Sequence, residues 1–193
     1  MNTISSGRRL AFISLSRQRG ASLLEGIAYL GIAAIVVLGA VSLLTGAFSS
    51  AQSNRTAEEV VSIRTAVKKL YMGQSIGYGA AGTVLDLTLV QAKVLPTTLT
   101  NTGTPTAPIV SNAWGGTVSV TGNLNKFNIT YTLVPQDACI SVISGASGWD
   151  SIAPGAPAGG AAPANAINTF PATPLQAQGV CGAANNTITW TSL

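Results

Sequence analysis

Few residues of this 193-residue chain have the chemistry that enzymes use, and their spacing argues against catalysis. The chain contains no histidine, which excludes histidine-based triads and histidine metal sites. No phosphate-binding motif of the GxxxxGK or GxGxxG type occurs, and the two cysteines are too far apart for a CxxC redox motif. The six acidic residues show no spacing typical of a catalytic pair. The sequence therefore predicts a protein that is not an enzyme, with no cofactor and no metal site.

Glu25 is the acidic residue with the most unusual position. It lies five residues after Gly20 and directly before an apolar run, Gly26 to Phe48, that contains no charged residue. A helix rises about 1.5 Å per residue, so this run is long enough to cross a hydrocarbon core of about 30 Å. A carboxylate at the edge of such a segment is costly in lipid. Glu25 is therefore a candidate functional residue whose partner must be found.

Cys139 and Cys181 both lie far beyond the apolar run. An even number of cysteines in an exported domain favours one disulfide, and two buried free thiols are the alternative. The bridge would close a loop over positions 140–180. For a loop of this length the chain-entropy relation gives about 4 kcal/mol of stabilisation, less any strain in the folded state.

The net charge of +4 comes entirely from the start of the chain. Arg8, Arg9, Arg17 and Arg19 precede Gly20, and the residues after it include six basic and six acidic side chains. No basic surface then remains for phosphate contacts, so nucleic-acid binding is not indicated. Arginines before a spanning segment predict that this end of the chain stays in the cytoplasm.

The elements that would position these residues begin with a long helix from Ala21 to about Met72, a range without proline. Its second half is polar, and Arg55 and Glu59 can pair there at i,i+4. Four apolar residues of this half form one stripe that would cover a sheet. They are Val60, Ile63, Val67 and Leu70. A break into two helices near Thr45-Gly46 is the alternative.

Beyond this helix we expect a small head of α+β class. A glycine-rich loop at 73–82 precedes a predicted short helix, Val84–Val94, with Thr83 and Asp86 as its capping box. The segment Pro96–Asn112 has no periodicity and is predicted to be a loop.

Alternating residues predict strands at Thr117–Thr121, Lys126–Val134 and Thr187–Thr191, the first two joined by a hairpin turn. Trp114 is expected to pack at the base of that hairpin. Pro135 starts a segment typical of a helix start, with proline at the first helical position. The following residues, Cys139–Ile143, fit a helix or a strand equally.

The segment Gly145–Gly182 is low in charge and rich in glycine, alanine and proline. Such a segment has little apolar surface to bury and would be poorly fixed without the disulfide. We therefore expect an antiparallel sheet of three or more strands with a disulfide-tied C-terminal loop.

The start of the chain resembles the signal of type IV prepilins. A basic leader, Gly20 followed by A-S-L-L-E, and the long apolar run carry the resemblance. In that family a membrane-embedded aspartic prepilin peptidase cuts directly after the glycine on the cytoplasmic face. Glutamate is the fifth residue of the mature chain there, and Glu25 holds this position here. The 20-residue leader and Ala21 as first mature residue resemble the type IVb branch.

Later segments resemble the PilS-like major pilins of thin conjugative pili and the toxin-coregulated pilin group. They are YMGQSIGYG after the helix, VLP at 94–96, NAWGG at 112–116 and VPQDAC at 134–139. The resemblance implies the type IV pilin fold, in which a long N-terminal α-helix packs on an antiparallel β-sheet head. It also implies three parts: a cleaved leader, 1–20; an apolar transmembrane and assembly half of the helix, 21–52; and a globular head, 53–193, with the disulfide loop 139–181.

The resemblance further implies a cleavage site between Gly20 and Ala21 and a contact between subunits at the new amino terminus. The Ala21 amine of a neighbouring subunit would neutralise Glu25 in the fibre core, while N-methylation of Ala21 stays open. The expected function is the major structural subunit of a type IVb pilus, used for adhesion, aggregation or conjugative mating-pair contact. The expected partners are other pilin subunits, the prepilin peptidase, an inner-membrane assembly platform and, before assembly, the inner membrane. The assembled fibre would lie outside the cell.

Other functions fit the same sequence. Within the superfamily the chain could be a minor pilin, a tip adhesin or a type II secretion pseudopilin. Outside it, an uncleaved signal anchor would make a membrane-anchored periplasmic protein that keeps its first 20 residues.

Overall fold

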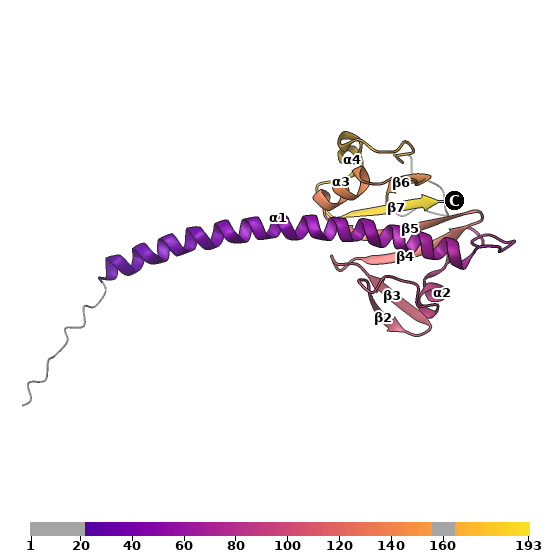
Figure 1. Ribbon diagram of the computed structural model, residues 1–193, viewed down its shortest axis with the longest axis horizontal. Helices are drawn as coiled ribbons and strands as arrows, with labels where there is room; N and C mark the ends of the chain where they lie inside the picture. The colour runs from indigo at the N-terminus through magenta and orange to yellow at the C-terminus, as the bar shows by residue number, and fades with distance from the viewer. Residues whose placement is uncertain (1–21, 156–164) are drawn as a thin grey trace, which may run out of the picture. The chain divides into compact units, whose positions relative to one another are not determined.

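The computed structural model describes residues 22–155 and 165–193 (Figure 1). The chain divides into two compact units, residues 1–43 and 44–193. In the first unit the described residues are almost entirely helical, and the second unit is an α+β head. The predicted cleavage residues, Gly20 and Ala21, lie outside the described residues.

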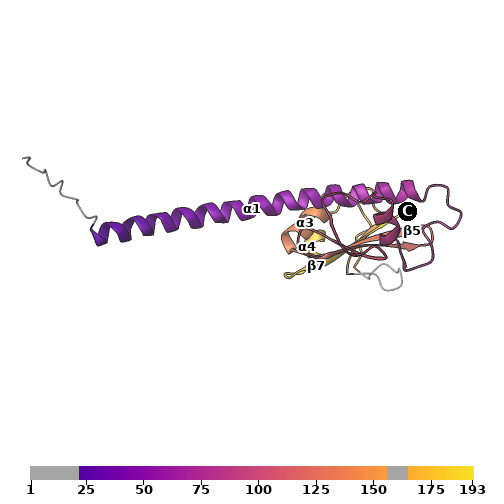
Figure 2. The same cartoon turned by 90° about the horizontal axis from the view of Figure 1, so that it is seen from below.

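The long helix α1 runs from Leu23 to Leu70, close to its predicted bounds and without the alternative break at Thr45-Gly46. Its apolar stripe is the part that the head covers. Val60, Ile63 and Val67 are buried, and Leu70 packs partly against the same core. Figure 2 shows this half of α1 lying along one face of the sheet. The 3.6-residue period of the helix therefore determines which residues reach the sheet.

The head is built on one antiparallel sheet in the order β2-β3-β4-β5-β7-β6, with β1 paired to β4. The strands are β1 Thr83–Val84, β2 Thr100–Thr104, β3 Ala107–Ser111, β4 Thr117–Asn123, β5 Lys126–Val134, β6 Ser151–Pro154 and β7 Asn186–Ser192. The other helices are α2 Asp86–Gln91, α3 Gln136–Ser144 and α4 Pro174–Val180. The central strands β5 and β7 carry the largest buried side chains, including Tyr131 and Trp190. Their rings meet edge to face at 5.5 Å between centroids.

All three predicted strands are confirmed. β5 has the predicted bounds, Lys126–Val134, and β4 extends two residues beyond its predicted end. β7 likewise extends the predicted strand by one residue at each end. Alternation of apolar and polar residues identifies these strands in the sequence, because one face of each is buried and the other is more polar.

The predicted short helix at Val84–Val94 is wrong at its start. Thr83 and Val84 instead form β1 against β4, and Leu85 donates its amide to the Val120 carbonyl. The helix α2 consequently begins at Asp86, and no side chain caps it. The Asp86 carboxylate accepts a hydrogen bond from the Val120 amide of β4. This bond to the sheet takes the place of the helix-capping contact that the local sequence favours.

The predicted loop at Pro96–Asn112 is also wrong, because most of it forms the hairpin of β2 and β3. All five residues of β2 are exposed, so the strand has no buried face to produce alternation. Hydrogen-bonded pairing with β3 holds β2 in place, and no local sequence pattern predicts this pairing.

The long segment Gly145–Gly182 contains more structure than predicted. β6 pairs with β7, and α4 begins with a complete capping box between Thr173 and Gln176. α3 resolves the open choice at Cys139–Ile143 in favour of a helix. Pro135 lies at its N-cap, one position before the predicted one.

The NAWGG segment is a turn between β3 and β4. The Asn112 side chain accepts the amides of Trp114 and Gly116 and donates to the Thr132 carbonyl. Any Cβ at Gly116 would lie 1.9 Å from that same carbonyl oxygen, so glycine is required there. Trp114 is partly buried against the core, as expected.

Candidate functional site

The apolar half of α1 is exposed among the described residues. Every large apolar side chain from Leu23 to Phe48 is at least half exposed. By length and composition, this part of the helix could cross a membrane. Exposed apolar surface on this scale marks a segment that packs against lipid or other protein chains. The surface is thus suited to membrane insertion and to helix–helix contact.

Glu25 lies in the first turn of α1, at the start of this apolar surface. Its side chain is exposed and forms no ion pair among the described residues. A carboxylate in the first turn is favourable because it faces the positive end of the helix dipole. Glu25 therefore presents a carboxylate that no described residue neutralises. Ala21, whose amine on a neighbouring subunit is expected to pair with it, lies outside the described residues.

The glycines of this helix are not explained by contacts within the chain. A Cβ built at Gly26, Gly31, Gly39 or Gly46 meets nothing within 4 Å. Gly122 behaves differently, since a Cβ there would lie 1.9 Å from the Tyr78 carbonyl oxygen. Glycine in an apolar helix lets another helix approach closely.

A buried polar cluster fastens the second half of α1 to the head. Glu59 is only 5% exposed, and Arg55 Nε lies 3.7 Å from its carboxylate. The same carboxylate accepts hydrogen bonds from Thr98 Oγ1 and, at 3.5 Å, from the Tyr131 hydroxyl. Burial, followed by the charge of Glu59, raises the pKa of Tyr131 far above its ordinary value. The sequence predicted the Arg55–Glu59 pair but not its burial, which depends on β5.

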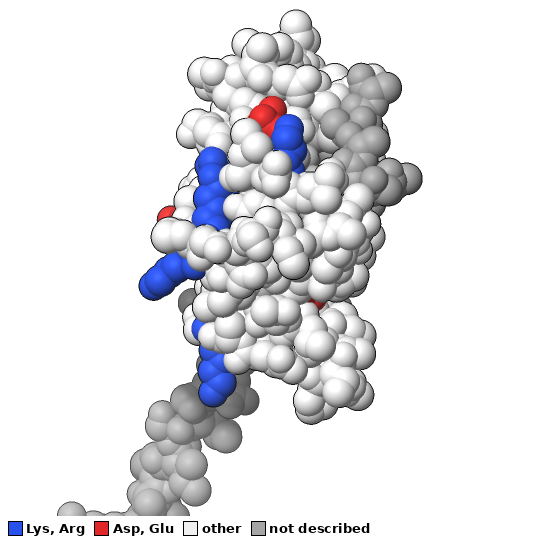
Figure 3. Space-filling model, turned by 90° about the vertical axis from the view of Figure 1, so that its right-hand side faces the viewer, with Lys and Arg blue, Asp and Glu red and all other residues white. Residues whose placement is uncertain are grey.

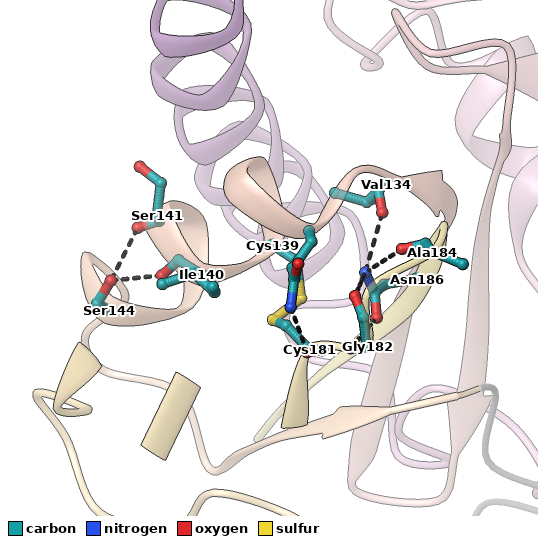
Figure 4. Close-up of a disulfide and its surroundings, with 10 residues drawn as sticks. Val134, Cys139, Ile140, Ser141, Ser144, Cys181, Gly182, Ala184 and Asn186 are labelled. Atoms are coloured by element: carbon teal, nitrogen blue, oxygen red, sulfur yellow. Dashed lines mark hydrogen bonds between the residues drawn. A yellow bond between two sulfur atoms is a disulfide. The ribbon is translucent and has the colours of Figure 1, made fainter. Parts of the chain in front are cut away.

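The disulfide between Cys139 and Cys181 joins α3 to the residue that follows α4 (Figure 4). Its Cα atoms are 6.0 Å apart, and both cysteines are buried. Gln136 donates to the Cys181 carbonyl from the first turn of α3. The bridge therefore holds the end of the long C-terminal segment against the core.

Asn186, which sequence reasoning missed, completes this region (Figure 4). Its amide donates to the carbonyl oxygens of Val134, Gly182 and Ala184, and its Oδ1 accepts the Gly182 amide. One side chain thus aligns the turn after the disulfide with the end of β5. An asparagine at the start of a strand provides no signal for this role.

Charged side chains on the head are few. On the face that Figure 3 shows, basic side chains lie mainly along one side and most of the surface is uncharged. Ser49 of α1 donates to the Asp137 carboxylate at the start of α3, and this hydrogen bond lowers the pKa of Asp137. Among the residues described here, no three histidine, cysteine or acidic side chains lie together as metal ligands do.

Comparison with known families and proteins points to fibre-forming subunits. The profile of a family described as PilS N terminal matches residues 50–193. The chain is 28% identical over 129 residues to a major structural subunit of bundle-forming pilus from Escherichia coli O127:H6, and equally to one from Escherichia coli O111:H-. The aligned region covers 65% of this chain and 63% of each relative, which is slightly less than two thirds of their length.

Two solved structures share the fold. A type IV b pilin from Salmonella typhi is 25% identical, with a TM-score of 0.55 over 73% of this chain and 97% of that one. TcpA, a type IV pilin from Vibrio cholerae El Tor biotype, is 14% identical, with a TM-score of 0.51 over 74% of this chain and 99% of that one. The second likeness concerns the fold alone.

Proposed function

Because the family profile matches three quarters of its length, the chain belongs to the PilS N-terminal family, and we propose that it is the major structural subunit of a type IVb pilus. One observation carries the proposal: a head with the fold of a type IVb pilin continues from a helix whose apolar half is exposed among the described residues. Polymerisation through that helix would keep its apolar surface out of water after it leaves the bilayer, because contacts with packed neighbouring helices replace contacts with lipid.

The proposal divides the chain into three parts with separate tasks. A prepilin peptidase removes the leader, residues 1–20, by cutting after Gly20. Residues 21–52 hold the subunit in the inner membrane and then form the fibre core, and residues 53–193 form the exposed head. An assembly platform in the inner membrane transfers the subunit from the bilayer to an extracellular fibre. The support for these steps is the leader motif together with the uncovered apolar helix.

Glu25 and the new amino terminus would form the polar contact of the fibre core. Cleavage creates a positive α-amine on Ala21, four residues before Glu25 in the sequence. In a core of packed apolar helices each charge would be stranded unless it met an opposite one. The Ala21 amine of a neighbouring subunit can neutralise Glu25 if adjacent helices are shifted along the fibre. This pair would specify the axial register, while apolar contacts supply most of the affinity.

The test is to produce the full chain in cells that assemble type IV pili and to analyse sheared fibres. Fibres made mainly of this chain, with Ala21 as first residue, are expected. Glu25→Ala should be cleaved at the same position and yet yield no fibres, whereas Ser22→Ala, a change in the same turn, should assemble normally. Abundant fibres from Glu25→Ala would refute the role of Glu25. A mature chain that keeps residues 1–20 would refute the pilin assignment.

A further inference from the structure

Arg64 and Lys68 form a two-cation pocket beside the end of β7. They lie one turn apart on α1, at a surface cavity of about 170 Å³. Trp149, Asp150 and Ser192 are among its other lining residues. Neither cation belongs to the proposed membrane-inserted half of the helix, and the proposed function assigns no role to either.

The head holds the Arg64 side chain in a fixed position. Its Nε donates to Ser192 Oγ at 3.0 Å, and its guanidinium carbon lies 4.7 Å from the centroid of a Trp149 ring. Gly148 makes room for it, since a Cβ there would lie 3.2 Å from Arg64 Nη1. The contacts to Ser192 and Trp149 leave the outer guanidinium nitrogens for an acceptor. A guanidinium fixed in advance loses less entropy when it binds a carboxylate.

The charged side chains that line the pocket are two cations and one acid. That acid is Asp150, whose carboxylate already pairs with Lys126 of β5. Leu193, the last residue of the sequence, also lines the pocket, and its carboxylate forms no ion pair with Arg64 or Lys68. Arg64 and Lys68 form no ion pair among the described residues, and the residues outside the description contain no acid. Like charges one turn apart repel each other. Burial and then the charge of Arg64 lower the pKa of Lys68. An incoming carboxylate would offset the repulsion from Arg64.

Each copy of the chain also carries one carboxylate without a partner in the head. The other four acids of the head are engaged, as follows: Glu59 with Arg55, Asp86 with the Val120 amide, Asp137 with Ser49 and Asp150 with Lys126. Glu58 is exposed and has no hydrogen bond or ion pair to described residues. At 100° per residue it lies on the side of α1 opposite to Ile63 and Val67.

We propose that Glu58 of one copy docks its carboxylate in the Arg64–Lys68 pocket of a neighbouring copy in the fibre. The inference rests on the proposed function, because only polymerisation sets many α1 helices side by side. Glu58 precedes Arg64 by six residues and Lys68 by ten, so the contact needs neighbouring helices shifted axially by about 9–15 Å. Two different faces of α1 take part, which is the arrangement that lets identical subunits form an open fibre.

The test uses charge exchange in the full chain, in cells that assemble it. Glu58→Lys and Lys68→Glu should each lower the yield of sheared fibres about tenfold, because each places like charges in contact at every subunit junction. The double variant restores opposite charges and should recover at least half of the wild-type yield. Lys69→Glu is the matched control, since that exposed lysine lies outside the pocket and should leave the yield unchanged.

A second measurement places the two residues in the fibre directly. The double variant Glu58→Cys with Lys68→Cys should form disulfide-linked multimers in isolated fibres, whereas Glu58→Cys with Lys69→Cys should form few. Equal cross-linking in both, or single charge variants that assemble like Lys69→Glu, would overturn the inference while wild-type fibres remain. Absence of fibres from the wild-type chain would instead refute the proposed function. Retention of the Cys139–Cys181 bridge on non-reducing gels checks that each charge variant folds.

Discussion

Removal of the Cys139–Cys181 disulfide should lower the free energy of unfolding of the head, because the bridge closes a long loop. The variant to make is Cys139→Ala with Cys181→Ala, which leaves neither a free thiol nor a buried hydroxyl. Both sulfur atoms lie in the core, where Cys139 is 1% exposed and Cys181 is 4% exposed. Alanine retains the Cβ at both positions, so the loss of packing is small beside the loss of the cross-link.

The magnitude follows from the length of the closed loop. The cysteines are separated by 42 positions, and the chain-entropy relation then gives about 4 kcal/mol at 25 °C. This value corresponds to a change of roughly a thousandfold in the unfolding equilibrium constant. The residues inside the loop supply little other restraint at its end, because α4 has seven residues and buries only Ala177.

Denaturation of the full chain in mild detergent can measure this loss through tryptophan fluorescence. All three tryptophans, Trp114, Trp149 and Trp190, belong to the head, so the signal reports unfolding of the head. The free energy of unfolding should fall by about 4 kcal/mol in the double variant. Wild-type chain in reducing agent should behave in the same way. A loss below about 1 kcal/mol would refute the reasoning, because the unfolded chain would then gain little freedom from the absent bridge.

Two further predictions concern the docking of α1 and the charge of Asp86. Ile63→Ala should lower the free energy of unfolding of the head by about 2–5 kcal/mol, since Ile63 is fully buried, whereas Val61→Ala, at a half-exposed position, should change it by less than about 1 kcal/mol. Similar losses in the two variants would show that the stripe does not anchor the helix. Burial raises the pKa of Asp86 above 3.8, so the folded state binds this proton more tightly than the unfolded chain does, and stability falls as pH rises from below 3.8 through the folded pKa. Asp86→Asn, which retains an oxygen for the Val120 amide, should therefore gain stability relative to wild type between pH 3.5 and pH 7; a difference independent of pH would contradict the assignment.

Local sequence patterns predicted the helices and strands that have one buried face. The stripe of α1 repeats with the helical period, and β5 and β7 carry enough alternation to identify them as strands. The disulfide could be anticipated from the number of cysteines and the exported character of the domain. Such signals survive in the sequence because burial of one face constrains residue type at regular intervals.

Elements that depend on distant partners gave no such signal. β2 is exposed throughout and is recognisable as a strand only by its pairing with β3. Thr83 has the local sequence of a helix cap, but it pairs with Gly122 of β4 in the sheet instead. The polar contacts of Asn112 and Asn186 likewise join segments that the sequence separates by up to 52 positions.

The sequence by itself determined the organisation of this protein along the chain: a basic first segment, an apolar helix with one acid, and a head with few charged side chains. Periodicity and charge are properties of neighbouring residues, so they can be read without coordinates. Only the tertiary structure decided that Glu59 is buried while Glu58 is free, although the two are adjacent. It likewise decided that Arg64 rests on Trp149 beside Lys68, with neither cation in an ion pair with a described residue. These features arise where the sheet folds back against α1, because burial and unpaired charge depend on which distant surfaces meet.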